Sequence, residues 1–210
     1  MGSSEPAAIG RILGLMALAE RLKSELRHSW TSSGRQESVA EHSWQMSLLA
    51  VLAHPHLTIA VDLGRVLEMV VVHDLVEAEA GDVPFFDTGD AKRSKAARER
   101  KAMATIRRIA GPEIGAHLAE LWEDFERSES PEARFANALD HLEVQIQHNA
   151  ADLGSWEPIE YGLVYTKMDA SCAVDPFLAA LCVAVKEAAE QKLTAGGVDV
   201  QKVKAGLAVG

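Results

Sequence analysis

Val70-Val71-Val72-His73-Asp74-Leu75-Val76-Glu77-Ala78-Glu79-Ala80-Gly81-Asp82 joins an apolar run to a group of titratable side chains, and it decides the fold predicted for this chain. On a helix with 3.6 residues per turn, His73 and Glu77 are about 40° apart, and Asp74 lies within about 100° of both. An imidazole and two carboxylates would therefore share one face of a helix that also buries valines. Buried charged groups need partners, and a metal ion is one partner that satisfies all three.

The composition around this stretch is that of a helical globular protein. Apolar residues make up 48% of the 210 residues, charged residues 25% and aromatic residues only 5%. This length fits one domain, so we expect residues 1–210 to form a single domain, with its core at about 10–165, a C-terminal helix at about 176–193 and a flexible tail. The net charge of −10 argues against a surface that binds a nucleic acid polymer.

The sequence pattern predicts neither a signal peptide nor a membrane-spanning segment. The N-terminus has no basic segment followed by an apolar segment, so we expect no signal peptide. No apolar run is long enough to cross a membrane. Cys172 and Cys182 are the only cysteines, and we expect both to be buried and reduced, as is usual in a cytoplasmic protein.

The spacing of apolar residues predicts an all-α bundle of about seven helices and no strands. Ser38 and Glu41 form the capping-box pattern at the start of one helix, and Gly81 is placed to end another. The segments 25–35 and 154–166 are predicted to be irregular. The helices are expected at about 6–23, 38–53, 62–80, 91–109, 113–127, from 130 onward, and 176–193.

Four residues on three of these helices are candidate metal ligands: His42, His73, Asp74 and Asp140. Two imidazoles and two carboxylates suit a divalent ion such as Mn, Fe, Co, Ni or Zn, and the lack of thiolates argues against a structural zinc finger. Each residue alone has a simpler explanation. His42 could be a core histidine bonded to a carbonyl, and Asp140 could pair with Arg134. One His-Asp pair is weak support, so the prediction depends on the combination.

The order of these four residues resembles the H…HD…D signature of the HD-domain metal-dependent phosphohydrolases. The surrounding strings look like the 5′-deoxynucleotidase branch of that family, and the resemblance covers roughly residues 10–165. The strings are Glu37-Ser38-Val39-Ala40-Glu41-His42-Ser43, His73-Asp74-Leu75-Val76-Glu77, Gly81-Asp82-Val83-Pro84, Leu121-Trp122-Glu123-Asp124-Phe125-Glu126, Ser130-Pro131-Glu132-Ala133-Arg134 and Ala138-Leu139-Asp140-His141-Leu142-Glu143.

The resemblance implies a compact HD domain, a homodimer, that hydrolyses (deoxy)nucleoside 5′-monophosphates to nucleoside and phosphate with one divalent metal. The metal would be held by His42, His73, Asp74 and Asp140. Glu77 would position or deprotonate the attacking water. Asp82 would help to hold the nucleotide or assist proton transfer, and Arg27 would orient the phosphate. The other substrate contacts that the resemblance implies are Asp74, Pro84 and Asp140.

The chain departs from the family pattern directly after Arg27. Some family members have Arg-Trp at this place, whereas here Arg27 is followed by His28 and the tryptophan comes later, as Trp30. The resemblance therefore leaves open how the sugar is contacted. We include Trp30 among the candidate substrate contacts, and Arg35 is a second candidate for the phosphate.

Three other functions stay open at this point. A di-iron oxygenase of the HD fold would need more histidines after the His-Asp pair, and only His117 lies between Asp74 and Asp140. A guanosine-tetraphosphate hydrolase would carry Glu-Asp soon after that pair, and this chain does not. The third alternative is a non-catalytic, metal-stabilised helical module that binds a nucleotide or a protein partner.

Overall fold

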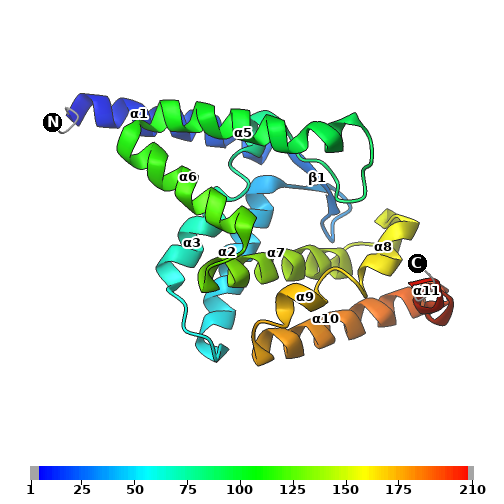
Figure 1. Cartoon of the computed structure of the whole chain (residues 1–210). Helices are drawn as coiled ribbons and strands as arrows, with labels where there is room; N and C mark the ends of the chain where they lie inside the picture. Colours follow the sequence, from blue (N-terminus) through cyan, green and yellow to red (C-terminus); the bar gives the residue numbers. More distant parts are fainter. Residues whose placement is uncertain (1–4, 208–210) are drawn as a thin grey trace.

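The computed structural model of the chain describes residues 5–207, and these residues are mostly helical (Figure 1). Seven of the described helices are ten residues or longer, which agrees with the predicted all-α bundle. They are α1 (Glu5–Ala19), α2 (Val39–Ala53), α3 (Leu63–Val72), α5 (Asp90–Ala110), α6 (Pro112–Arg127), α7 (Pro131–Ala150) and α10 (Pro176–Ala195). The shorter helices are η1 (Glu20–Lys23), η2 (His54–His56), α4 (Glu77–Ala80), η3 (Leu153–Ser155), α8 (Pro158–Leu163), α9 (Asp169–Cys172) and α11 (Val200–Leu207).

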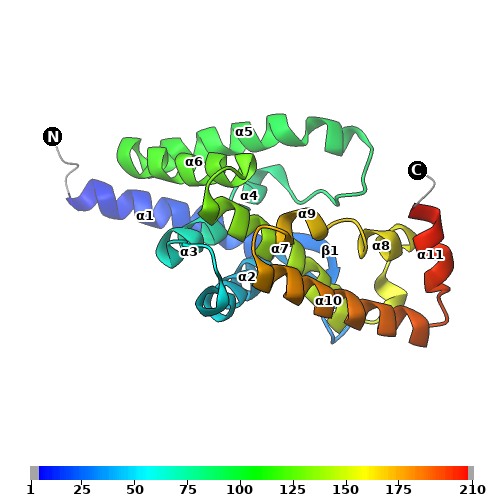
Figure 2. The same ribbon diagram turned by 60° about the horizontal axis from the view of Figure 1, so that its bottom comes forward.

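The long helices are arranged around α2, α3 and α7, which pack against one another at the centre. Helix α5 lies along α1 and also packs on α6, whereas α10 lies along α7 on the other side of the molecule (Figure 1). The described ends of the chain, α1 and α11, lie at opposite ends of the molecule in both views (Figure 2). No helix in the described part of the chain is both long enough and apolar enough to span a membrane.

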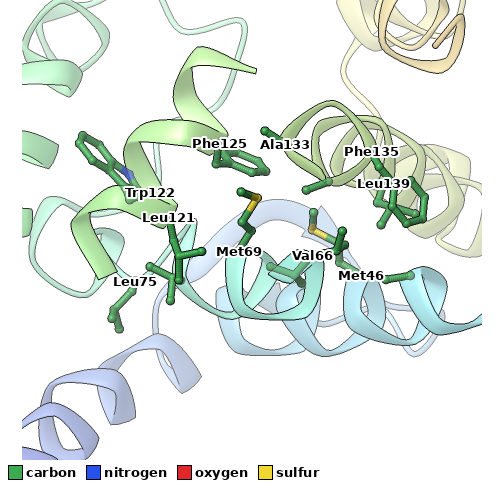
Figure 3. Packing of buried hydrophobic residues seen from close by; sticks show 14 of the residues in the cluster. Met46, Val66, Met69, Leu75, Leu121, Trp122, Phe125, Ala133, Phe135 and Leu139 are labelled. Carbon is green, nitrogen blue, oxygen red and sulfur yellow. The ribbon is translucent and has the colours of Figure 1, made fainter. Parts of the chain in front are cut away.

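The core lies where α2, α3, α6 and α7 meet, and Figure 3 shows their apolar side chains converging there. Fully burying one such side chain stabilises the fold by about 1.5–3 kcal/mol. Because these contacts join helices that are far apart in the sequence, they fix the relative positions of the helices. The labelled core residues include Met46, Val66, Met69, Leu121, Phe125, Phe135 and Leu139.

Two helix limits, the start of α2 and the end of α4, lie at the residues that the sequence predicts. The Ser38 hydroxyl accepts from the N–H of Glu41, and the Glu41 carboxylate accepts from the N–H of Ser38, so the predicted capping box is confirmed. Gly81 ends α4 with a φ of 76°, a left-handed value that glycine adopts most easily.

The helix predicted at 62–80 is not continuous, and this is a correction. Helix α3 ends at Val72, residues 73–76 form turns, and α4 begins at Glu77. The His73 ring Nδ1 lies 2.8 Å from the carbonyl oxygen of Val70, which a continuous helix would pair with the N–H of Asp74. The side chain thus competes with the backbone for this acceptor, so His73 and Asp74 lie in a bend and not on a helix face.

The segment predicted as the loop 25–35 is also partly wrong, because it contains a strand. The strands β1 (Leu26–Trp30) and β2 (Gln36–Ser38) pair antiparallel and form a hairpin. The N–H of Thr31 donates to the carbonyl of Arg35, and Gly34 takes a φ of 84° in the turn. Strands this short carry too few residues for an alternating pattern to be detected.

The C-terminal region is more ordered than the sequence predicted. Residues 154–166, predicted to be irregular, contain part of η3 and all of α8, and the tail predicted to be flexible forms α11 as far as Leu207. A second, smaller apolar cluster accounts for both differences. Trp156, Val164 and Leu193 are buried in it, and Tyr161 of α8 and Val200 of α11 pack against it. Residues 208–210 lie outside the described part of the chain.

Candidate metal centre and cleft

His42 lies near the start of α2 and its side chain is fully buried. Its Nδ1 is hydrogen-bonded to the carboxylate of Glu143, which is also buried. A carboxylate accepts this hydrogen bond, so in the neutral imidazole the lone pair lies on Nε2. The Nε2 atom is buried and has no hydrogen-bond partner.

His73 has the same arrangement in the bend between α3 and α4. Its Nδ1 donates to the Val70 carbonyl, and its buried Nε2 has no hydrogen-bond partner. The two imidazole rings are 5.5 Å apart between centroids. Both free Nε2 atoms therefore lie in one small volume.

Two carboxylates meet these nitrogens. An oxygen of Asp74 lies 3.1 Å from Nε2 of His73 and 3.8 Å from Nε2 of His42. An oxygen of Asp140, from α7, lies 3.3 Å from Nε2 of His42. The ligand atoms of His42, His73 and Asp140 all lie within 4.8 Å of one another.

This set of donors fits a divalent metal ion. Two buried imidazole nitrogens without partners face two carboxylates, and no thiolate is present among them. The four predicted ligands are thus brought together, with Asp74 joining the three that cluster most tightly. Glu143 and the Val70 carbonyl orient the rings of His42 and His73, respectively, through hydrogen bonds to Nδ1, as outer partners of metal-bound histidines commonly do.

The local electrostatics also favour a cation. Burial acts against ionisation of Asp74 and Asp140, but the two neighbouring imidazoles outweigh it and hold the pKa of both carboxyl groups far below their usual range. Burial and Arg27 act to lower the pKa of His42, yet the carboxylates of Glu143 and Asp140 raise it to about 10. The negative charge here attracts a positive charge, either a proton or a metal ion.

A cleft of about 230 Å³ opens beside this centre. Its lining includes Asp74, Asp140, Glu77, Asp82 and Arg27. Burial raises the pKa of Glu77 to about 9, with further increases from Asp74 and Asp82, and one oxygen of Glu77 is buried without a partner. Burial also raises the pKa of Asp82.

Cations line the same cleft although the whole chain is acidic. Burial acts to lower the pKa of Arg27, but Asp74, Glu143 and Asp140 raise it overall, so the guanidinium stays charged. Lys92, Lys95 and Lys167 also line the cleft. The ammonium groups of Lys167 and Lys92 lie 3.2 and 5.0 Å from the centroid of the Phe85 ring. An anionic group entering the cleft would meet these charges.

Two of the predicted substrate contacts lie elsewhere. Arg35, at the turn of the hairpin, forms a two-point ion pair with Glu41, and it does not line the cleft. Trp30 is also absent from the lining; its carbonyl accepts from Gln147 at 2.7 Å, and its ring packs edge-on to His28. Pro84, another of these predicted contacts, lines the cleft.

The sequence reasoning gave no role to several side chains that the structure brings to this site. Glu143 had a usable signal, because it follows Asp140 by three residues on one helix and so lies on the same face. The lysines and Glu160 had none. Lys92 and Lys95 lie in the first turns of α5, Glu160 lies in α8 and Lys167 lies between α8 and α9, and only tertiary packing brings them to one cleft.

Residues 19–174 match the model of the HD domain. The chain belongs to the HD domain family. This agrees with the prediction from the His42, His73-Asp74 and Asp140 pattern, and the match includes all four of these residues as well as the hairpin and α2 to α9.

Relatives of this HD domain protein include curated 5′-deoxynucleotidases. The 5′-deoxynucleotidase HDDC2 of Danio rerio is 33% identical over 138 residues, which is 65% of this chain and 67% of the relative. The protein of the same name from Bos taurus is 31% identical over 156 residues, which is 70% of this chain and 74% of the relative.

Solved structures agree with the family. A crystal structure described as a predicted metal-dependent phosphohydrolase from Magnetospirillum magnetotacticum is 30% identical, with a TM-score of 0.78, and the match covers 91% of this chain and 97% of that one. A conserved hypothetical protein from Pyrococcus furiosus is 22% identical with a TM-score of 0.63, over 83% of this chain and 99% of that one. The second similarity supports the fold alone.

Proposed function

We propose that this HD domain protein is a metal-dependent phosphomonoesterase that hydrolyses deoxynucleoside 5′-monophosphates to nucleoside and phosphate. The observation that carries the proposal is the pair of unpartnered buried imidazole nitrogens facing Asp74 and Asp140 beside a cleft lined with cations. The relationship to proteins named 5′-deoxynucleotidases supports the substrate class.

His42, His73, Asp74 and Asp140 would hold one divalent ion, of Mn, Fe, Co, Ni or Zn, and this ion would supply Lewis-acid chemistry at the phosphoryl group and at water. Arg27 would bind the phosphate and offset its charge, and it keeps its own charge because acidic neighbours surround it. We assign this role to Arg27 over Arg35, since Glu41 holds Arg35 outside the cleft.

Hydrolysis adds the oxygen of water to phosphorus and breaks the bond between phosphorus and O5′. Glu77 would accept a proton from the attacking water, since it lines the cleft beside Asp74 and one of its oxygens is buried without a partner. Asp82, which lines the same cleft and also has a raised pKa, would assist the transfer of a proton to the departing O5′. The products are then a nucleoside and inorganic phosphate.

We also propose that residues 1–210 form a single domain that works as a homodimer in the cytoplasm. The family resemblance supports the dimer. Two buried free cysteines, Cys172 and Cys182, suit a reducing compartment.

The test combines metal analysis with phosphate release over a panel of deoxy- and ribonucleoside monophosphates. The purified protein should retain a divalent ion and release phosphate, and His73→Ala and Asp74→Ala should each lose both properties. Full activity in either variant would show that the assignment of the metal ligands is wrong.

Two other outcomes separate the alternatives. A bound metal without turnover of any phosphoester would favour the non-catalytic binding module. Oxygen uptake would favour an oxygenase. Glu187→Gln, on the exposed face of α10, is a control that should keep wild-type metal content and activity.

A further inference from the structure

Away from the metal centre, a second group of ionisable side chains lines the same cleft. It consists of His28 from β1, His148 from α7 and Glu160 from α8. One oxygen of Glu160 lies 3.7 Å from Nε2 of His28 and 3.7 Å from Nε2 of His148. Three separate elements therefore bring ionisable side chains together around one carboxylate.

These side chains do not satisfy one another. Distances of 3.7 Å are too long for hydrogen bonds, and Nε2 of His28 is buried without a partner. Glu160 is only 4% exposed, and its other oxygen accepts from the N–H of Glu157 at 2.7 Å. Buried polar atoms in native proteins usually have a partner, so a ligand in the cleft is the natural source of the missing hydrogen bonds.

The distance from the metal centre suits a nucleotide. Asp140, Val144 and His148 are spaced by four residues along α7 and all line the cleft. At 1.5 Å per residue, Asp140 and His148 are about 12 Å apart along the helix. This span is comparable with the length of an extended nucleoside monophosphate, so a phosphate near Asp140 would place the base near His148 and Glu160.

The chemistry at this end of the cleft suits a nucleobase. Burial lowers the pKa of His148 to about 4, so its imidazole is neutral and offers one donor and one acceptor. Burial raises the pKa of Glu160 to about 7, so this group can also accept or donate. The ring of Phe86 lines the cleft, edge-on to His28 at 5.0 Å, and provides an aromatic surface for stacking.

We infer that Glu160, with His28 and His148, binds the edge of the nucleobase and so contributes to substrate specificity. This inference rests on the proposed nucleotidase function. It assigns the phosphate and the base to opposite ends of one cleft, with α7 as the element that joins them.

Glu160→Gln is the informative variant. Gln also serves in a capping box, so its oxygen can keep the bond to the Glu157 N–H. Its NH₂ group would then face the cleft, which replaces an acceptor with a donor. Glu157→Gln makes the same chemical change on the same helix start but at an exposed side chain, and it serves as the matched control.

The assay compares deoxynucleoside monophosphates with 2-deoxyribose 5-phosphate, which has the phosphate and the sugar but no base. Glu160→Gln should reduce kcat/KM about tenfold for at least one nucleotide, mainly through KM, because the amide offers a donor where the base needs an acceptor and one hydrogen bond is lost. Hydrolysis of 2-deoxyribose 5-phosphate should not change, and Glu157→Gln should match the wild type on every substrate.

Calorimetric binding of deoxynucleosides, which lack the phosphate, is a second measurement that does not depend on turnover. Binding that weakens in Glu160→Gln supports the base site even if the protein releases no phosphate, in which case only the proposed function fails. Unchanged nucleoside binding, or an equal loss of activity on 2-deoxyribose 5-phosphate, would overturn the inference and leave the phosphatase proposal standing.

Discussion

At the scale of single residues, the outer partners of the two histidines are as informative as the candidate ligands. Glu143 is fully buried, and its carboxylate is hydrogen-bonded to Nδ1 of His42. A buried carboxylate is costly unless it is hydrogen-bonded. Its position is explained if it fixes the orientation of His42 and leaves Nε2 free to bind a metal ion.

Glu143→Gln should therefore weaken metal binding without removing a ligand. The amide keeps the shape but loses the charge that orients and polarises the imidazole, and the loss of such outer partners typically lowers metal affinity by about 10–100-fold. Competition with a chelating dye measures this affinity directly. Glu187→Gln, at an exposed position of α10, is the control, and equal affinity in both variants would contradict the role given to Glu143.

At the scale of secondary-structure elements, close contacts between helices and loops hold the site in place. Helix α5 packs closely on α6, and Gly115 of α6 lies against the backbone of Arg107. A Cβ atom added at Gly115 would come within 2.6 Å of the Arg107 carbonyl oxygen. Lys92 and Lys95, which line the cleft, belong to α5, so this contact also positions the cleft.

Gly115→Ala should destabilise the protein by about 1–3 kcal/mol, because the backbones of α5 and α6 must move apart. Gly10→Ala is the matched control, since a Cβ at Gly10 of α1 meets no atom within 4 Å. In that open position alanine should stabilise the helix by about 0.5–1 kcal/mol. Urea unfolding measures both free energies, and a neutral Gly115→Ala would contradict the close packing of α5 and α6.

Asp175 links the start of α10 to the loop between α2 and α3. Its carboxylate accepts from the N–H of Phe177 and from the N–H and hydroxyl of Thr58, as well as from the N–H of Ile59. Burial acts to raise the pKa of Asp175, but these donors outweigh it and lower the pKa. A lowered pKa means that the stabilising contribution is present above the unfolded pKa, about 3.9, and is lost as the pH falls through the folded pKa.

Asp175→Asn should therefore cost about 1–3 kcal/mol at pH 7, because hydrogen bonds to a charged acceptor are replaced by bonds to a neutral one. The difference in unfolding free energy between wild type and variant should shrink as the pH falls below about 4. Urea unfolding at several pH values measures it. Asp152→Asn, at an exposed cap whose carboxylate accepts from the nearby Gly154 N–H, is the control and should be nearly neutral. A difference that does not depend on pH would refute the argument.

At the scale of the whole molecule, the structure leaves two apolar helix faces exposed. On α1, Leu13 and Met16 are each 63% exposed, and on α2 Trp44 is 66% and Leu48 is 45% exposed. Contiguous apolar patches of this kind commonly mark protein interfaces. The proposed homodimer would cover one of these faces with a second copy of the chain.

Analytical ultracentrifugation should therefore give about twice the chain mass of 22.7 kDa. Of two double variants, Leu13→Glu with Met16→Glu and Trp44→Glu with Leu48→Glu, one should give monomers because it charges the interface. The other should remain dimeric and serves as the control. A monomeric wild type at micromolar concentration would exclude the homodimer.

The sequence by itself determined the family, the candidate metal ligands and most of the helices. Helix limits follow from local signals such as the Ser38 capping box, whose hydrogen bonds join residues close together in the sequence and so do not depend on long-range packing. The four candidate ligands could be named because their residue types and order form a recognisable pattern. Glu77, Asp82, Arg27 and Pro84, which the sequence also singles out, line the cleft beside these ligands.

Only the tertiary structure decided which other side chains share that cleft. The bend at His73 arises from competition for the Val70 carbonyl, and helical periodicity cannot reveal such a choice. The group of His28, His148 and Glu160 forms because β1, α7 and α8 pack together, and Arg35 is excluded because Glu41 holds it. Long-range packing sets the contacts of Glu160 with His28 and His148, since they join separate elements. The contacts of His73 with Val70 and of Arg35 with Glu41 are local, but each is a choice between alternative hydrogen-bond partners that the spacing of apolar residues does not reveal.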